Sequence, residues 1–367
     1  MIDHTFVLNL LKTLVNIRSV SGEEQEIMLY LEKELKSWGV KTKRFQARDK
    51  RFNLLARYGE GQPVFCLNSH ADTVPPSGIS VPYAESKNGI LYGLGACDAK
   101  SSLAAMMAAF RNQVAAGERL NGTLDLLISV DEERKNKGVH SVIKQGYQCR
   151  YAIVGEPTSL EIISHHMGQI FLELRARGRA AHSSSPWKGI NAVDELIDVV
   201  NSIRRRVEDG NIFPGIGKQS LNLGAIRGGD VANRVPDSCR ALIDIRILPG
   251  RSAADILSRT DALFKGNKNV SCKVLRKTEP MKPNKNPSFI NLIKSQARKI
   301  TGRGVISKGT RFWTEAADFR NELDAETAVL GPGNIRQAHS ENEFVKLTQV
   351  FQAAEIYSST ARRLLSR

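Results

Sequence analysis

The sequence has few cysteines, and their spacing argues against the common kinds of cysteine site. Five cysteines are scattered over 367 residues, and no two of them form a CxxC pair. An odd number of scattered cysteines is typical of reduced thiols in the cytoplasm, and it favours neither a disulfide framework nor a thiolate zinc site. We therefore expect a cytoplasmic protein.

The sequence also lacks long hydrophobic runs. No stretch approaches the roughly 18 apolar residues that a membrane-spanning helix needs, and the first 20 residues lack the basic segment and apolar core of a signal peptide. With 41% hydrophobic and 25% charged residues, the composition is that of an ordinary folded protein. We expect no membrane partner.

Aromatic residues are scarce, which matters for the net charge of +15. The basic run Arg204–Arg206 has no aromatic residues interleaved with it, as a stacking surface for nucleic acid would need. Glu208 and Asp209 follow that run, as is typical of a solvated helix face. We expect no nucleic-acid partner, because a mild positive field that attracts a carboxylate substrate explains the charge equally well.

Helix and strand patterns alternate over the first 165 residues and predict an α/β sheet with helices on both faces. The Ser21–Glu24 stretch reads as a capping box, from which we expect an amphipathic helix ending at Gly39. Further on, a β-α-β-β-α order predicts a small inserted α+β domain. We expect a catalytic domain formed by residues 1–167 and 281–367, with the inserted domain at 168–280.

Ionisable residues stand where the predicted strands end. In an open α/β sheet, ligands bind beyond the carboxyl ends of the strands. These residues are His70 and Asp72 after PVFCLNS, Asp98 before an alanine-rich helix, Glu132 and Glu133 after LDLLISVD, Glu156 after YAIVG, and His339 after ETAVLGPG. Adjacent strand residues point to opposite faces, so we expect Glu132 and Glu133 to have different roles.

Taken singly, each of these residues has an ordinary structural explanation, as a satisfied histidine, a helix cap or a turn. Taken together, several carboxylates at one sheet edge would repel each other unless a cation neutralised them. Imidazole and carboxylate donors without thiolate suit zinc, with manganese or cobalt as weaker alternatives. Two histidines and three carboxylates are enough for two metals that share an aspartate, and such a pair can polarise a carbonyl and generate hydroxide.

Five motifs, in order and with suitable spacing, resemble those of the di-zinc metallopeptidase family that includes aminoacylases, acetylornithine deacetylase, succinyl-diaminopimelate desuccinylase and glutamate carboxypeptidases. The motifs are His70-x-Asp72-Thr-Val-Pro, Gly93-x-Gly-x-x-Asp98-x-Lys100, Asp131-Glu132-Glu133, Gly155-Glu156-Pro-Thr and His339-Ser340. The resemblance spans nearly the whole chain. It implies a mixed-sheet α/β catalytic domain with an inserted α+β lid domain through which the enzyme forms homodimers.

The resemblance also implies two Zn²⁺ ions per chain, for which Co²⁺ or Mn²⁺ could substitute. One ion would be held by His70 and Glu156, the other by Glu133 and His339, and Asp98 would bridge the two. Asp72 would orient His70. Glu132 would be the general base that takes a proton from the bridging water and passes it to the leaving amine.

In the inserted domain, the resemblance implies three further residues. His182, in Gly178-Arg-Ala-Ala-His-Ser183, would stabilise the tetrahedral oxyanion, and in several family members this histidine comes from the partner subunit. Asn233 and Arg246 would hold the carboxylate of the substrate, a role that suits the guanidinium fork. Without the resemblance, each would be read as a surface residue.

The substrate expectation depends on two further stretches. Arg311–Ala316 and the stretch GPGNIRQAHSENEF look most like acetylornithine and acetylcitrulline deacetylases, and the glutamate at position 156 goes with acylases and carboxypeptidases. The expected reaction is hydrolysis of N2-acetyl-L-ornithine or N-acetyl-L-citrulline in arginine biosynthesis. A succinyl-diaminopimelate desuccinylase of lysine biosynthesis, a metallo-dipeptidase or carboxypeptidase, and a non-catalytic binding homologue are the alternatives.

Two departures from the family pattern affect this expectation. The basic loop Arg134–Lys137 replaces a small turn, and Met167 stands where a basic residue is common. A basic loop suits citrulline or an acidic acyl group better than a cationic ornithine chain, so we expect it to decide the substrate preference. His165 and His166 are expected to bind no metal, because the five family ligands already fill both sites.

Overall fold

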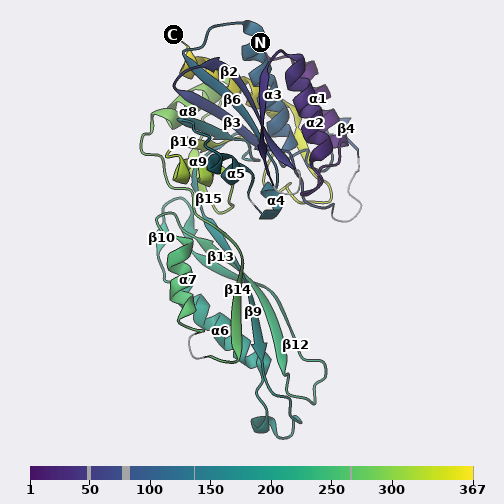
Figure 1. Ribbon diagram of the computed structural model, residues 1–367, viewed down its shortest axis with the longest axis vertical. Helices are drawn as coiled ribbons and strands as arrows, with labels where there is room; N and C mark the ends of the chain where they lie inside the picture. Colours follow the sequence, from purple (N-terminus) through teal and green to yellow (C-terminus); the bar gives the residue numbers. More distant parts are fainter. Residues whose placement is uncertain (48–50, 77–82, 136, 265–266, 367) are drawn as a thin grey trace. The chain divides into compact units, whose positions relative to one another are not determined.

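The computed structural model describes residues 1–47, 51–76, 83–135, 137–264 and 267–366 (Figure 1). The chain divides into two compact units. The first unit comprises Met1–Ser164, Pro283–Lys308 and Thr314–Arg367, and the second comprises His165–Lys282 and Gly309–Trp313. Gly309–Trp313 was expected in the catalytic domain but belongs to the second unit. Within that unit the Met167 N–H donates to the Thr310 carbonyl at 3.1 Å, and Trp313 Nε1 donates to the Glu279 carbonyl at 3.1 Å.

A mixed eight-stranded sheet forms the frame of the first unit within the described ranges, although two of its strands end in residues of the second unit, at His165 and His166 and at Gly309 and Thr310. In spatial order its strands are β1 (Lys41–Gln46), β2 (Phe52–Glu60), β6 (Gly122–Ser129), β3 (Val64–His70), β7 (Tyr151–Val154), β16 (Glu326–Val329), β8 (Ile162–His166) and β15 (Ser307–Thr310). Strands β6, β3, β7 and β16 are parallel, whereas β1 and β2, β2 and β6, and β16 and β8 pair antiparallel. The expected α/β class with a mixed sheet is confirmed. The carboxyl ends of the four parallel strands meet at one edge, where ligands bind in such sheets.

Helices cover both faces of this sheet. They are α1 (His4–Asn16), α2 (Gln25–Ser37), α3 (Lys100–Ala116), α8 (Ser288–Thr301) and α10 (Leu347–Leu365) in one hydrophobic cluster, together with the shorter α4 (Glu132–Lys135), α5 (Gly138–Lys144) and α9 (Ala316–Glu322). Leu126 and Ile128 of β6 belong to the same cluster as the long helices. Leu127, between them, is also buried but lies outside that cluster, on the opposite face of the sheet. On that face α5 contacts β1 and β2, and α9 contacts β7 and β16. Among the helices of the described ranges, none is both long and apolar enough to cross a lipid bilayer.

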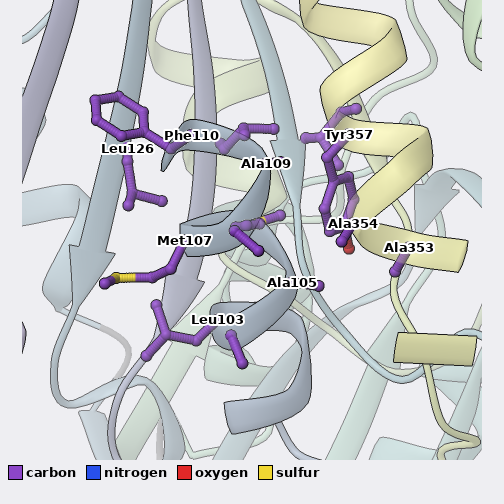
Figure 2. Packing of buried hydrophobic residues seen from close by; sticks show 14 of the residues in the cluster. Leu103, Ala105, Met107, Ala109, Phe110, Leu126, Ala353, Ala354 and Tyr357 are labelled. Carbon is purple, nitrogen blue, oxygen red and sulfur yellow. The ribbon is translucent and has the colours of Figure 1, made fainter. Parts of the chain in front are cut away.

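Helix α3 is fixed from two sides (Figure 2). Met107 and Phe110 extend beside Leu126 of β6, while Ala105 and Ala109 lie on the side of α10. Alanines four residues apart share one helix face, and their small side chains let α10 approach closely. This packing fixes the start of α3, and with it the loop that precedes the helix.

A small separate sheet joins β17 (Phe344–Lys346), β5 (Ile90–Tyr92) and β4 (Glu85–Lys87).

The second unit is an antiparallel sheet covered by two helices. Its strands, in spatial order, are β12 (Ser220–Gly228), β13 (Ser238–Ile247), β9 (Gly168–Arg177) and β14 (Val270–Thr278), and its helices are α6 (Ala192–Val207) and α7 (Ala253–Asp261). The 3₁₀ helix η1 (Pro186–Lys188) and the short hairpin of β10 (Ile212–Phe213) and β11 (Gly217–Lys218) complete the unit. Along the chain the order is β9-α6-β12-β13-α7-β14, so the expected α+β insertion is confirmed.

Candidate metal centre

The edge of the large sheet gathers two groups of possible metal ligands. The groups are His70, Asp98 and Glu156, and Asp98, Glu133 and His339. Within each group, one donor atom from every residue lies within 4.8 Å of the others. The structure therefore brings together all five residues that the family resemblance assigns to metal ions. Two trios of imidazole and carboxylate donors that share an aspartate fit two zinc-like cations.

His70, at the end of β3, is held in one orientation. Its Nδ1 lies 2.9 Å from the backbone carbonyl of Asp72, which fixes the proton on that nitrogen. Its Nε2 faces the carboxylates, at 3.2 Å from Asp98 Oδ1 and 3.8 Å from Glu156 Oε1. The lone pair of Nε2 is thus directed into the group of candidate ligands.

Asp72 connects His70 with the segment that carries the paired glutamates. Its Oδ1 lies 3.5 Å from His70 Nδ1, and its carboxylate accepts the backbone N–H groups of Glu132 and Glu133, each at 3.1 Å. Ser21 Oγ donates a further hydrogen bond at 2.6 Å. One buried carboxylate therefore positions both a candidate ligand and the start of α4.

The expectation that Glu132 and Glu133 end a strand is wrong. Strand β6 stops at Ser129, Asp131 adopts a positive φ of 66°, and the two glutamates open the short helix α4. Successive helix residues are about 100° apart around the axis. The two side chains therefore point in different directions because they are neighbours on a helix, not on a strand. Glu133 Oε1 lies 2.9 Å from His339 Nε2, whereas Glu132 is buried beside His70 and Asp72.

Electrostatics at this edge favour bound cations. Burial raises the pKa values of Glu132, Glu133 and Glu156, and neighbouring carboxylates raise them further. The hydrogen bond with Glu133 raises the pKa of His339 to about 9. Cations would offset the repulsion among the carboxylates and would displace the proton from His339. The donor set and its burial thus fit divalent metals.

Glu343 anchors the loop that carries Asp98, and sequence reasoning missed it. Its carboxylate accepts the backbone N–H groups of Gly95, Cys97 and Asp98 at 2.8, 2.8 and 2.9 Å. Burial raises the pKa of Glu343 to about 7. The contact joins residues 245 positions apart, so no local sequence pattern could indicate it.

Two residues of the predicted capping box make hydrogen bonds around the candidate metal centre instead of capping a helix. Helix α2 begins at Gln25 without a side-chain cap, and Ser21 bonds to Asp72 as described above. Glu24 accepts a hydrogen bond from buried Arg51 at 3.0 Å, and the same guanidinium lies 3.1 Å from Asp131. These contacts brace the turn before α4, so the capping-box expectation is wrong because tertiary partners take both side chains.

Glu315, in the stretch that suggested the deacetylase subfamily, is a buried positioning residue. It accepts the Val139 N–H at 2.9 Å and a short hydrogen bond from Ser129 Oγ at the end of β6. Burial raises the pKa of Glu315 to about 7. The side chain therefore joins α9 to the strand end and to α5.

The raised pKa of Glu315 predicts that the stability of the protein depends on pH. Between pH 4.5 and about 7 its carboxyl keeps the proton in the folded protein and loses it on unfolding, so the free energy of unfolding falls as pH rises through this window. Across this window the free energy of unfolding falls by up to about 3 kcal/mol because of Glu315. We expect Glu315→Gln to flatten the pH dependence between pH 5 and 8, measured by urea unfolding of the chelator-treated protein. Exposed Glu341→Gln is the control, and an unchanged slope in Glu315→Gln would contradict the assignment.

The three residues expected in the lid all lie in the second unit. His182 and Asn233 are exposed neighbours, because the Ser183 N–H donates to the Asn233 carbonyl at 3.0 Å. Arg246 lies near the far end of β13 and pairs with Asp244 at 2.9 Å. The strand from Ser238 to Arg246 spans roughly 26 Å at about 3.3 Å per residue. The structure therefore brings His182 and Asn233 together and holds Arg246 apart from them.

The remaining residues singled out from the sequence have ordinary surroundings. In the basic loop, Arg134 and Lys137 are exposed, and Asn136 lies outside the described residues. His166 Nδ1 lies 2.9 Å from the Met167 carbonyl, and the His165 ring packs on Phe213 with ring centroids 5.2 Å apart. Neither histidine belongs to a group of metal ligands found among the described residues.

The chain is similar to proteins of known sequence and structure. The model of peptidase family M20/M25/M40 matches residues 66–363. An acetylornithine deacetylase of Proteus mirabilis is 33% identical over 83% of this chain and 81% of its own length. A probable succinyl-diaminopimelate desuccinylase of Staphylococcus epidermidis is 25% identical over 98% of both chains. The crystal structure of aminopeptidase PepT from Bacillus cereus superposes with a TM-score of 0.83 at 20% identity, over 99% of both chains.

Proposed function

The chain belongs to peptidase family M20/M25/M40 and hydrolyses amide bonds, and from that premise we propose that it is a zinc-dependent deacetylase of N-acetyl amino acids. Its proposed substrate is N2-acetyl-L-ornithine or N-acetyl-L-citrulline, in arginine biosynthesis. The observation that carries the proposal is the pair of ligand groups that share Asp98, with buried Glu132 beside them. A non-catalytic binding homologue would have no need of that arrangement.

Two Zn²⁺ ions are the proposed cofactors, with Co²⁺ or Mn²⁺ as possible substitutes. His70 and Glu156 would hold one ion, Glu133 and His339 the other, and Asp98 both. When bound, such a pair supplies Lewis-acid polarisation of the substrate carbonyl and lowers the pKa of water toward neutrality.

Glu132 moves the proton in the proposed reaction. Its carboxylate takes a proton from the attacking water as the oxygen adds to the acyl carbon, and then gives that proton to the leaving nitrogen. The backbone N–H of Glu132 is fixed on Asp72, which also orients His70, so the base and one ligand keep a constant relation. Burial raises the pKa of Glu132, which favours its acting as an acid in the second half of the reaction.

Homodimerisation through the second unit is part of the proposal. His182 and Asn233 lie at one end of β13 and Arg246 near the other, roughly 26 Å apart by strand length. A single small substrate spans much less than that. It can contact both groups only if one of them comes from a second subunit, so we propose that His182 acts across the dimer, where it would stabilise the oxyanion.

His182→Ala tests this role. Loss of one oxyanion donor lowers kcat by about 10²–10³-fold, and we expect zinc content to stay unchanged because His182 belongs to neither ligand group. Mixing His182→Ala with Glu132→Gln subunits should restore activity. In a mixed dimer, the site with an intact Glu132 receives an intact His182 from the other subunit. Lys188→Ala, exposed in the same loop region, is the control. No gain on mixing, under conditions where subunits exchange, would count against action across the dimer.

The substrate is tested with a panel of acetyl-ornithine, acetyl-citrulline, succinyl-diaminopimelate and acetyl-methionine, assayed with zinc or cobalt. Exposed Arg134 and Lys137 follow the proposed base, and their charge suits the neutral citrulline chain better than the cationic ornithine chain. We expect acetyl-citrulline to have the highest kcat/KM. A preference for succinyl-diaminopimelate, the substrate named for the Staphylococcus epidermidis relative, would replace the deacetylase proposal by a desuccinylase.

A cytoplasmic location is proposed from the cysteines. All five are free thiols in the structure, and Cys66, Cys97, Cys149 and Cys239 are buried. Reduced thiols are the rule in that compartment.

A further inference from the structure

A third group of possible metal ligands lies apart from the metal centre. It consists of His140 on α5 and Asp318 and Glu322 on α9, whose donor atoms lie within 4.8 Å of one another. Asp318 and Glu322 are four residues apart, so both carboxylates project from one face of the helix. None of the three residues takes part in the proposed hydrolysis.

Asp318 gives independent evidence that this group lacks a partner. Its Oδ2 atom is buried and has no hydrogen-bond partner among the described residues. Burial raises the pKa of Asp318 well above its ordinary value, and Glu315 and Glu322 raise it further. A buried carboxylate oxygen without a partner is costly, because it has lost water and gained nothing in return. His140 Nδ1 and Glu322 Oε1 already meet at 2.6 Å, so Asp318 Oδ2 is the buried oxygen of the group for which the described residues offer no hydrogen-bond partner.

We propose that His140, Asp318 and Glu322 bind a third divalent cation of the zinc class. Imidazole nitrogen and carboxylate oxygen are both zinc donors, and three protein ligands leave a fourth position for a water molecule. Donor atoms around tetrahedral zinc lie about 3.4 Å apart at bond lengths of about 2.1 Å. The donors of His140 and Glu322 are closer than that, at 2.6 Å, and their side chains are 37% and 34% exposed, which leaves both room to rotate.

The position of the site suggests a structural role. Val139, next to His140, donates its N–H to Glu315 at the start of α9, and Glu315 also holds the end of β6. A cation at the third site would add a further link between α5 and α9, beside the Val139–Glu315 hydrogen bond and the contact of His140 with Glu322. That link would stabilise the segment that follows the paired glutamates, without contacting the substrate.

Metal counting on the full-length protein tests the proposal. We expect the wild type to bind one more equivalent of zinc at excess free Zn²⁺ than it keeps after dialysis against metal-free buffer, measured by mass spectrometry of the metal. His140→Gln and Glu322→Gln should each lose that additional equivalent and keep the tightly held zinc. His4→Gln is the control, because the His4 ring stacks on Phe351 with centroids 4.2 Å apart, lies 3.6 Å from Glu355, and belongs to no ligand group found among the described residues.

Thermal unfolding supplies a second measurement. Excess Zn²⁺ should raise the Tm of the wild type and of His4→Gln by more than it raises the Tm of His140→Gln. Equal zinc content in the wild type and His140→Gln at excess Zn²⁺ would overturn the proposal and leave the three residues as an ion-paired cluster. The comparison is a difference of one equivalent between matched proteins, so it stays informative even if the metal centre holds fewer ions than proposed.

Discussion

Glu132→Gln is expected to abolish turnover while both tightly held zinc ions stay in place. The amide has the same shape as the carboxylate and keeps the backbone contact with Asp72, but it cannot accept a proton from water. General-base catalysis contributes about 10²–10⁴-fold, so we expect kcat to fall by about 10³-fold or more. The measurement pairs steady-state kinetics on the best substrate of the panel with the zinc content of the same sample.

Neighbouring variants separate the proton-transfer role from a ligand role. Glu133→Gln should lose zinc as well as activity, because Glu133 meets His339 at 2.9 Å within one of the ligand groups. Exposed Glu341→Gln should change neither quantity. Substantial residual turnover in Glu132→Gln would refute its assignment as the base.

Asp98→Asn is expected to weaken both metal sites at once. Asp98 Oδ1 lies 3.2 Å from His70 Nε2, and Oδ2 lies 3.6 Å from His339 Nε2, so one carboxylate serves both groups. An asparagine side chain offers one acceptor oxygen and an amino group that cannot bind a cation. We expect loss of at least one tightly held zinc ion and a fall in kcat/KM of about 10³-fold or more, since the pair supplies several kcal/mol of catalysis.

Glu156→Gln is the comparison for Asp98→Asn. Glu156 belongs only to the group that contains His70, whereas Asp98 belongs to both groups. Loss of the Glu156 carboxylate should therefore affect one zinc ion and leave the other in place. Retention of both ions in Asp98→Asn, after dialysis against metal-free buffer, would rule out Asp98 as the bridging ligand.

Several residues of the candidate metal centre could be singled out from the sequence because strand ends are local features. A buried apolar run that stops at a polar residue identifies His70 and Glu156, and the topology of a parallel sheet then places both at one edge. The prediction for Glu132 and Glu133 was wrong in detail, because the apolar run gave no sign of the positive φ at Asp131 that ends the strand. The different surroundings of the two glutamates were nonetheless expected.

The supporting contacts could not be predicted. Glu315 and Glu343 act on residues 176 and 245 positions away, and Ser21 reaches Asp72 across 51 positions. Such pairs depend on tertiary packing, which a single sequence does not encode as a local pattern. The capping-box expectation failed for the same reason, since a cap signal was outweighed by a distant buried partner.

The reach of Glu343 back to Asp98 has a consequence for biosynthesis of the protein. During synthesis His70, Asp98 and Glu156 precede His339 and Glu343, whose carboxylate fixes the Asp98 loop, by more than 180 positions. A nascent chain that has not reached residue 339 therefore holds an incomplete group of candidate ligands. The group of candidate ligands is completed only once residue 339 has been synthesised, and a product truncated before that residue lacks both His339 and the Glu343 anchor.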